Sequence, residues 1–161
     1  LDNASGGFIS NSIESLSGHL TEITSIKEGD AFLNQELPNK RIALIKIDVE
    51  GHELEVLAGL RKRIKSDKPL IILEMNHWCL NAFKRCTIPE FLEKIEALTD
   101  DILAFDDYSG QSIIIGSKYP SETYHVMHEH IVKNRFPTLI LSFNADTLHS
   151  IQYNLDQEFS S

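Results

Sequence analysis

The segment IALIKIDVEGHELEVLAGL, residues 42–60, joins an apolar run to a charged segment with helical periodicity. Residues 42–47 are almost continuously apolar, which is typical of a strand covered on both faces in a parallel sheet. Apolar side chains then recur at the spacing of one helical face: Leu54, Leu57, Leu60 and Ile64. An amphipathic helix is therefore predicted over residues 52–67, directly after the strand.

A second apolar run, PLIILEM at residues 69–75, follows this helix. Strand, helix and strand in so short a span form a βαβ unit, whose two strands are parallel. A capping box at Thr87 and Glu90 starts another helix, and residues 102–117 are predicted to form two strands joined by a tight turn. The sequence thus predicts an α/β fold with a mostly parallel sheet and an antiparallel hairpin at one edge.

The N-terminal flank is less regular. Residues 1–18 are rich in Ser, Gly and Asn and are predicted to form a loop. Residues 20–29 alternate loosely between polar and apolar side chains and are predicted to form a short strand. Asp30 is placed to cap a brief helix, AFLNQEL, which Pro38 ends.

The C-terminal part of the chain carries apolar segments without an evident partner. It contains an amphipathic piece at residues 123–134 and the run FPTLILSF at residues 136–143. The sequence indicates no role for either segment. We therefore predict an α/β domain over residues 1–118 and a C-terminal tail of unknown role over residues 119–161.

Composition and charge exclude several classes of partner. The chain has 161 residues and a net charge of −9, so binding to nucleic acid through phosphate neutralisation is not expected. No apolar run approaches the roughly 20 residues of a membrane span, and no membrane partner is expected. Cys79 and Cys86 fit neither a redox motif nor a recognised zinc spacing. A disulfide between them stays open, but free thiols in a reducing compartment fit better, which favours a cytoplasmic location.

Polar side chains follow the two predicted parallel strands at the point where each strand ends. They are Asp48, Glu50, Glu74, Asn76 and His77. Asp48 and Glu50 follow the first strand, and the others belong to the end of the second. Ligands of open α/β sheets bind beyond the carboxyl ends of the strands, and neighbouring strands lie about 5 Å apart. The candidate site residues are therefore Asp48, Glu50, Glu74 and His77.

Each candidate also has a structural interpretation. Asp48 could cap the following helix, Glu74 could bond a backbone loop, and His77 taken alone is more typical of a partly exposed structural histidine. Glu53 and Glu55 fall at the start of the predicted helix, where the dipole favours an acid. We interpret these two as ordinary helix acids.

Several other chemistries lack their sequence motifs. The chain contains no G-x-S-x-G nucleophile elbow, no GxGxxG and no P-loop. His125, His128 and His130 have an HxxHxH spacing. No strand-end carboxylate accompanies them in the sequence, so no metal site is predicted there.

The segment at residues 42–60, followed by KPLIILEMNH at residues 68–77, resembles the FkbM family of S-adenosylmethionine-dependent methyltransferases. The family pattern is an apolar run, then K-[IV]-D-[VI]-E-G-x-E-x-x-[VL]-x-G, then K-P-x-[IL]-x-x-E. The matching positions are Lys46, Asp48, Glu50, Gly51, Glu53, Gly59, Lys68, Pro69 and Glu74. The strong part of the resemblance spans about residues 26–77, and the hairpin near residues 102–116 suits the end of such a domain.

The resemblance implies the C-terminal part of a Rossmann-like class I methyltransferase sheet. Residues 42–47 and 69–75 would be its fourth and fifth strands, and the hairpin would supply the last two. Such domains bind the donor with a glycine-rich loop after the first strand and an acid after the second, and the sequence shows neither. We therefore expect a fragment of a longer domain that lacks the donor-binding strands and binds the donor weakly alone.

The resemblance also implies a chemistry, the O-methylation of a hydroxyl on a small molecule or glycan by S-adenosylmethionine. Asp48 and Glu50 would lie near the sulfonium and the substrate, where a carboxylate can accept the hydroxyl proton. Glu74 and then His77 follow them as candidate bases, His77 because imidazole titrates near neutral pH.

Two other functions stay open. The chain could be a non-catalytic α/β module that associates through the exposed edge of strand 42–47 or through its C-terminal tail, with a second copy of itself as one partner. A less favoured alternative is a hydrolase that binds Mg²⁺ or Mn²⁺ through Asp48, Glu50 and Glu74.

Overall fold

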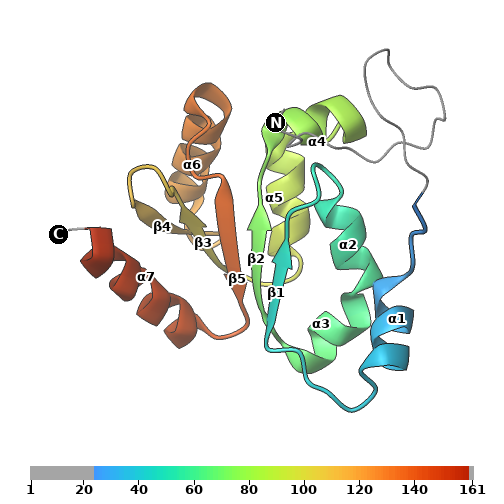
Figure 1. The fold of residues 1–161 in the computed structure, drawn as a ribbon. Coiled ribbons are helices and arrows are strands. Elements are labelled where there is room, and N and C mark those ends of the chain that lie inside the picture. The colour runs from blue at the N-terminus through green and yellow to red at the C-terminus, as the bar shows by residue number, and fades with distance from the viewer. Residues whose placement is uncertain (1–23, 160–161) are drawn as a thin grey trace, which may run out of the picture.

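The computed structural model describes residues 24–159, which form a mixed five-stranded sheet with helices on both faces (Figure 1). In chain order the elements are α1 (Gly29–Glu36), β1 (Leu44–Ile47), α2 (Glu53–Gly59), α3 (Arg61–Asp67), β2 (Leu70–Glu74), α4 (His77–Lys84), α5 (Ile88–Glu96), β3 (Asp101–Phe105), β4 (Ser112–Ile115), α6 (Pro120–Lys133), β5 (Thr138–Ser142) and α7 (Ala145–Phe159). None of these helices is long and apolar enough to cross a membrane. The loop predicted over residues 1–18 lies outside the described residues. The strand predicted over residues 20–29 is absent from its described part, residues 24–29, where Gly29 already begins α1.

The strand order in the sheet is β1-β2-β5-β3-β4. β1 and β2 pair in parallel, with Ile47 opposite Leu73, which confirms the predicted βαβ unit. The pairings of β2 with β5, β5 with β3, and β3 with β4 are antiparallel. The prediction of a mostly parallel sheet is therefore wrong for the described residues. The cause is β5, which inserts between β2 and β3 and runs opposite to both.

The sheet does not end at the boundary predicted at residue 118, because the chain beyond it supplies a central strand. The apolar run at residues 136–143 contains β5, whose Leu139 and Leu141 are fully buried. The antiparallel β3–β4 hairpin is confirmed. It does not supply the last two strands of the sheet, because β5 follows it in the chain and separates it from β2 (Figure 1).

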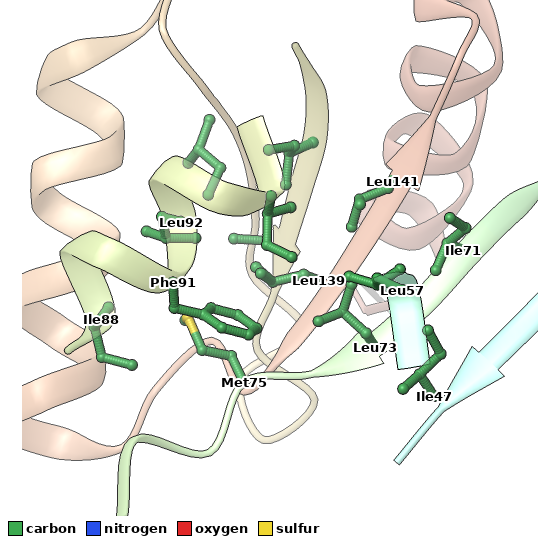
Figure 2. Packing of buried hydrophobic residues seen from close by; sticks show 14 of the residues in the cluster. Ile47, Leu57, Ile71, Leu73, Met75, Ile88, Phe91, Leu92, Leu139 and Leu141 are labelled. Atoms are coloured by element: carbon green, nitrogen blue, oxygen red, sulfur yellow. The ribbon is translucent and has the colours of Figure 1, made fainter. Parts of the chain in front are cut away.

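The alternation of side chains along the strands creates two hydrophobic layers. Leu73 and Leu139 lie opposite each other on β2 and β5 and belong to the main core (Figure 2). Buried side chains of α2, α3, α4, α5 and α6 complete this core. On the other face of the sheet, Leu103 and Ile140 pack against Leu148 of α7. Among the described residues, α7 therefore covers the second face of the sheet.

The helix predicted over residues 52–67 is present but is divided at Leu60 into α2 and α3. Its apolar face is confirmed, since Leu57, Leu60 and Ile64 are buried in the main core. This helix pair is the crossover of the βαβ unit, and it fixes the direction in which the chain leaves the end of β1.

The sequence predicted that Asp30 caps its own helix, and this prediction is wrong. The N-cap position of α1 is Glu28, and Asp30 is buried in the first turn. The carboxylate of Asp30 accepts hydrogen bonds from the backbone N–H groups of Lys62 at 2.8 Å and Arg63 at 2.9 Å, at the start of α3. Asp30 therefore satisfies the first amide groups of α3 and ties α1 to it.

β1 lies at one edge of the sheet and pairs only with β2 among the described strands. Leu44, at the start of β1, is 55% exposed. The exposed, partly apolar edge predicted for this strand is thus present in the part of the chain that the structure describes.

Candidate active site

Three carboxylates meet where β1 and β2 end. Asp48, Glu50 and Glu74 each contribute an oxygen, and these oxygens lie within 4.8 Å of one another. Their proximity follows from the parallel pairing of β1 and β2, which brings both carboxyl ends to the same edge of the sheet. Three of the four candidate residues are thus brought together, and His77 is not part of this group.

A left-handed turn holds Glu50 after β1. Glu50 has a φ of 51° and Gly51 a φ of 93°, which residues other than glycine adopt rarely. The carboxylate of Glu50 accepts hydrogen bonds from the thiol of Cys79 at 3.1 Å and from the side-chain amide of Asn76 at 3.4 Å. These bonds fasten the turn to the start of α4.

Replacing Gly51 with Ala is expected to destabilise the protein by about 1–3 kcal/mol, the usual cost of a strained backbone position. A Cβ at this position would lie 3.0 Å from the carbonyl oxygen of Cys79 and 3.1 Å from its carbonyl carbon, and neither can move aside like a flexible side chain. Urea denaturation followed by circular dichroism measures the change. Gly59→Ala is the matched control, because its Cβ would meet no atom closer than 3.5 Å. Equal stability of the two variants would contradict this account of the turn.

Asp48 and Glu74 differ in their protonation. Burial, together with the hydrogen bond to Asp48 and its charge, raises the pKa of Glu74 to about 7. A hydrogen bond from the ammonium of Lys46, at 2.8 Å, lowers the pKa of Asp48. Below neutral pH the pair therefore consists of a protonated Glu74 that donates to an ionised Asp48. Glu74 loses its proton as the pH passes through about 7.

The free energy of unfolding is expected to fall as the pH rises toward 7. The pKa of Glu74 in the folded state lies above its ordinary value of 4.5, so the folded protein holds this proton more tightly than the unfolded chain does. The resulting stabilisation is complete below the ordinary pKa and is lost as the pH rises through the folded-state value. Gln is neutral at every pH. The free energy of unfolding of Glu74→Gln minus that of the wild type is therefore expected to be larger at pH 8 than at pH 5. Urea denaturation of both proteins at the two pH values measures this, and parallel pH profiles would refute it.

Two hollows adjoin the turn after β1. The smaller has a volume of about 200 Å³. Its polar lining residues are Lys46, Asp48, Glu74, Asp107 and Thr138. The larger, of about 720 Å³, is mostly apolar, lies between α1 and α2, and reaches Val49 and His52. Two consecutive residues of the turn therefore line different hollows: Asp48 lines the smaller one and Val49 the larger one.

Comparison with known proteins agrees with this arrangement of strand-end acids. Residues 5–108 match the methyltransferase FkbM domain. The chain belongs to the FkbM methyltransferase family. The match covers close to two thirds of the FkbM chain, includes β1 and β2 with their terminal acids, and confirms the resemblance inferred from the sequence. No curated protein and no solved structure matches it.

Glu53 of the FkbM domain is not the ordinary helix acid that we predicted. Its side chain is fully buried, and one carboxylate oxygen accepts a hydrogen bond from the backbone N–H of Gly51 at 3.0 Å. The other oxygen has no hydrogen-bond partner among the described residues. Glu55 does behave as a surface acid and pairs with Lys84 at 2.6 Å. The family pattern, which includes Glu53, was the one signal in the sequence that separated the two.

His77 begins α4 and lies against His130 of α6. The two rings are perpendicular, with their centroids 5.1 Å apart. His130 is fully buried, and burial lowers its pKa to about 4. His125 and His128 are exposed, so the HxxHxH spacing of the FkbM chain does not bring its three histidines into one buried place. Sequence reasoning missed both the pairing of His77 with His130 and the contact of Cys79 with Glu50, because no local pattern reports either.

Proposed function

We propose that this FkbM domain transfers a methyl group from S-adenosylmethionine to a hydroxyl group of a small molecule or glycan. The observation that carries the proposal is the group of three carboxylates at the ends of β1 and β2, in which Glu74 has a pKa of about 7. Methyl transfer to a hydroxyl needs a base, because the oxygen must lose its proton. A base whose pKa lies near the working pH suits this task.

The charge of the site fits the donor. When bound, S-adenosylmethionine supplies an electrophilic methyl group on a positively charged sulfur. Asp48 and Glu50 are the residues that would hold this sulfonium, because carboxylates attract a cation. Glu50 is kept in place by the thiol of Cys79, whose pKa is raised to about 12 by burial and by Glu50 itself. This thiol therefore stays a neutral hydrogen-bond donor.

Glu74 is the proposed general base, and Asp48 keeps it basic. Lys46 holds Asp48 in its ionised form, and the negative charge of Asp48 in turn favours the protonated form of Glu74. In its ionised form Glu74 would take the proton of the acceptor hydroxyl as the methyl carbon exchanges its bond to the donor sulfur for one to the acceptor oxygen. His77 is the second candidate for this role, although its ring lies against His130.

The smaller hollow beside Glu74 is the proposed acceptor site. Its volume of about 200 Å³ corresponds to about seven water molecules, which is the size of a single sugar ring. Hydroxyl, carboxylate and ammonium groups line it, and all of these bond hydroxyl-rich molecules. Asp48, Glu74 and Asp107 disfavour an anionic acceptor, so a neutral one fits best.

Two further properties belong to this proposal. A cytoplasmic location is supported by Cys79 and Cys86, which are free and buried, as is usual in a reducing compartment. Self-association is supported by the edge of β1, which pairs only with β2 among the described strands, and by its exposed Leu44, because such a strand edge can pair with another copy. We propose no nucleic-acid or membrane partner.

Calorimetric titration with S-adenosylmethionine and S-adenosylhomocysteine tests the donor site. It is carried out with this chain and with the protein that the complete reading frame encodes. Asp48→Asn is expected to weaken binding of S-adenosylmethionine at least tenfold and binding of S-adenosylhomocysteine less, because only the former carries the sulfonium charge. Asp146→Asn, at an exposed acid of α7, is the control. If neither protein binds either compound, methyl transfer is refuted and a non-catalytic association module becomes the better account.

A metal-dependent hydrolase is the second candidate, and one observation favours it. The three carboxylate oxygens lie close enough together to share one oxygen-ligated ion such as Mg²⁺. Against it, Glu74 holds a proton up to about neutral pH. A rise in melting temperature with Mg²⁺ or Mn²⁺ that Asp48→Asn abolishes would favour this candidate over methyl transfer.

A further inference from the structure

Two histidines at the contact of α4 and α6 each have a ring nitrogen that is shielded from solvent. These atoms are Nδ1 of His77 and Nε2 of His130, and neither has a hydrogen-bond partner among the described residues. His130 is fully buried. Unpaired buried polar atoms are uncommon in folded proteins, and an ion or a water is a frequent explanation for them.

The hydrogen bonding of His130 identifies which of its nitrogens can bind a ligand. Nδ1 of His130 lies 2.7 Å from the backbone carbonyl oxygen of Arg135. A carbonyl oxygen only accepts hydrogen bonds, so Nδ1 carries the hydrogen and Nε2 presents a lone pair. Histidines that bind metal ions almost always donate their other ring N–H in this way, to a carbonyl or a carboxylate.

The separation of the two rings matches that of two histidines on one metal ion. A ring nitrogen lies about 1.1 Å from the ring centre and about 2.1 Å from a bound Zn²⁺, so two imidazoles on one tetrahedral ion have centres about 5.2 Å apart. The centroids of His77 and His130 are 5.1 Å apart. The perpendicular ring planes also keep the two rings from stacking against each other.

We propose that His77 and His130 bind one transition-metal ion of the class that prefers imidazole, with Zn²⁺ as its best representative. Imidazole nitrogens favour Zn²⁺, Cu²⁺ and Ni²⁺, whereas carboxylates favour Mg²⁺, Ca²⁺ and Mn²⁺. The site is therefore chemically distinct from the carboxylate group of Asp48, Glu50 and Glu74. No third His, Cys, Asp or Glu joins the two histidines among the described residues, so the remaining positions on the ion fall to water or to an added ligand.

The ion would connect parts of the chain that frame the acid site. His77 follows Asn76, whose side chain bonds Glu50 and caps α4. His130 is hydrogen-bonded to the backbone carbonyl of Arg135. The segment after Arg135 leads into β5, and just before that strand the carbonyl of Pro137 accepts a hydrogen bond from the backbone N–H of Met75. A metal ion between the two rings links the start of α4 to the connection from α6 to β5. This inference is independent of methyl transfer.

Titration of Zn²⁺ into the full chain, prepared without a histidine tag, tests the site by calorimetry. We expect one site per chain. His77→Ala and His130→Ala are each expected to weaken it at least tenfold. His125→Ala and His128→Ala, at exposed positions of the same helix as His130, are the matched controls and keep it.

Visible absorption of the Co²⁺-loaded protein gives a second readout that does not depend on a folded His130 variant. Nitrogen and oxygen ligation predicts bands from the metal alone, without the intense ultraviolet band that a thiolate of Cys79 or Cys86 would add. Three results would overturn the inference: no Zn²⁺ site in the wild-type protein, a site that survives His77→Ala, or a thiolate band. If the wild-type protein has no Zn²⁺ site, a buried water would be the hydrogen-bond partner of the two ring nitrogens.

Discussion

The Glu74→Gln protein is expected to transfer methyl groups about 10²- to 10⁴-fold more slowly than the wild type, the usual contribution of a general base. Gln has nearly the shape of a protonated Glu and can still donate a hydrogen bond to Asp48, but it cannot take a proton from the acceptor. The loss should appear in kcat, because donor and acceptor still bind. The measurement is transfer of a labelled methyl group from S-adenosylmethionine to a panel of neutral hydroxylated compounds, with single sugars first.

The pH profile distinguishes a base from a residue that only supports the structure. Since the pKa of Glu74 is about 7, the wild-type rate should rise as the pH passes through that value and then level off. The residual rate of Glu74→Gln should lack this rise. Glu93→Gln, at an exposed acid of α5, is the control for loss of one negative charge. If Glu74→Gln reacts at the wild-type rate, another group accepts the proton of the hydroxyl. His77→Ala would then be the next variant to measure.

Glu74 is also the residue at which stability and activity are expected to diverge. The raised pKa that makes its carboxylate a useful base means that ionising it costs folding free energy. Glu74→Gln should therefore be the slower enzyme and, above pH 7, the more stable protein. Such a trade-off is typical of active-site residues and is not expected of a residue with a purely structural role.

Ending the chain at residue 118 is expected to abolish cooperative folding. The truncation removes β5, which pairs with β2 on one side and with β3 on the other. Without it the hairpin loses its connection to the rest of the sheet, and the fully buried Leu73 and Ile102 face water instead of a neighbouring strand. Urea denaturation followed by circular dichroism should show a broad, non-cooperative change for the truncated chain and a sharp transition for the full chain.

A single substitution in β5 gives the graded form of this test. Leu139→Ala is expected to lower the free energy of unfolding by about 2–5 kcal/mol, because it leaves a cavity in the main core. Leu44→Ala, the same substitution at a half-exposed position of β1, should change it by only about 0.5 kcal/mol. Two results together would support a domain boundary at residue 118. The truncated chain would unfold cooperatively, and Leu139→Ala and Leu44→Ala would lower the free energy of unfolding by similar amounts.

The local elements of this fold could be read from the sequence with fair accuracy. The apolar run and helical periodicity at residues 42–67 predict β1 and the helix pair after it, and Thr87 does cap α5 through the backbone N–H of Glu90. Each of these signals involves residues within a few positions of one another. Periodicity and capping report on such short-range interactions directly.

The acid site was predicted in part, for a reason that also explains what was missed. Asp48, Glu50 and Glu74 come together because two strands that follow each other in a βαβ unit are parallel neighbours, which is a rule of topology rather than a detail of packing. The pKa of Glu74 and the complete burial of Glu53 depend on how tightly the surrounding side chains pack. The sequence carries no local signal for either.

By itself the sequence determined the βαβ unit, the hairpin, the family and the strand-end acids, because these rest on short-range periodicity and on a dense motif. Only the tertiary structure decided that β5 separates β2 from the hairpin, that Asp30 caps α3, and that His77 meets His130. Each of these contacts joins segments more than 30 residues apart in the chain. Such pairings are chosen by the packing of the whole core, in which every apolar strand competes for the same neighbours, and no single segment of sequence encodes that choice.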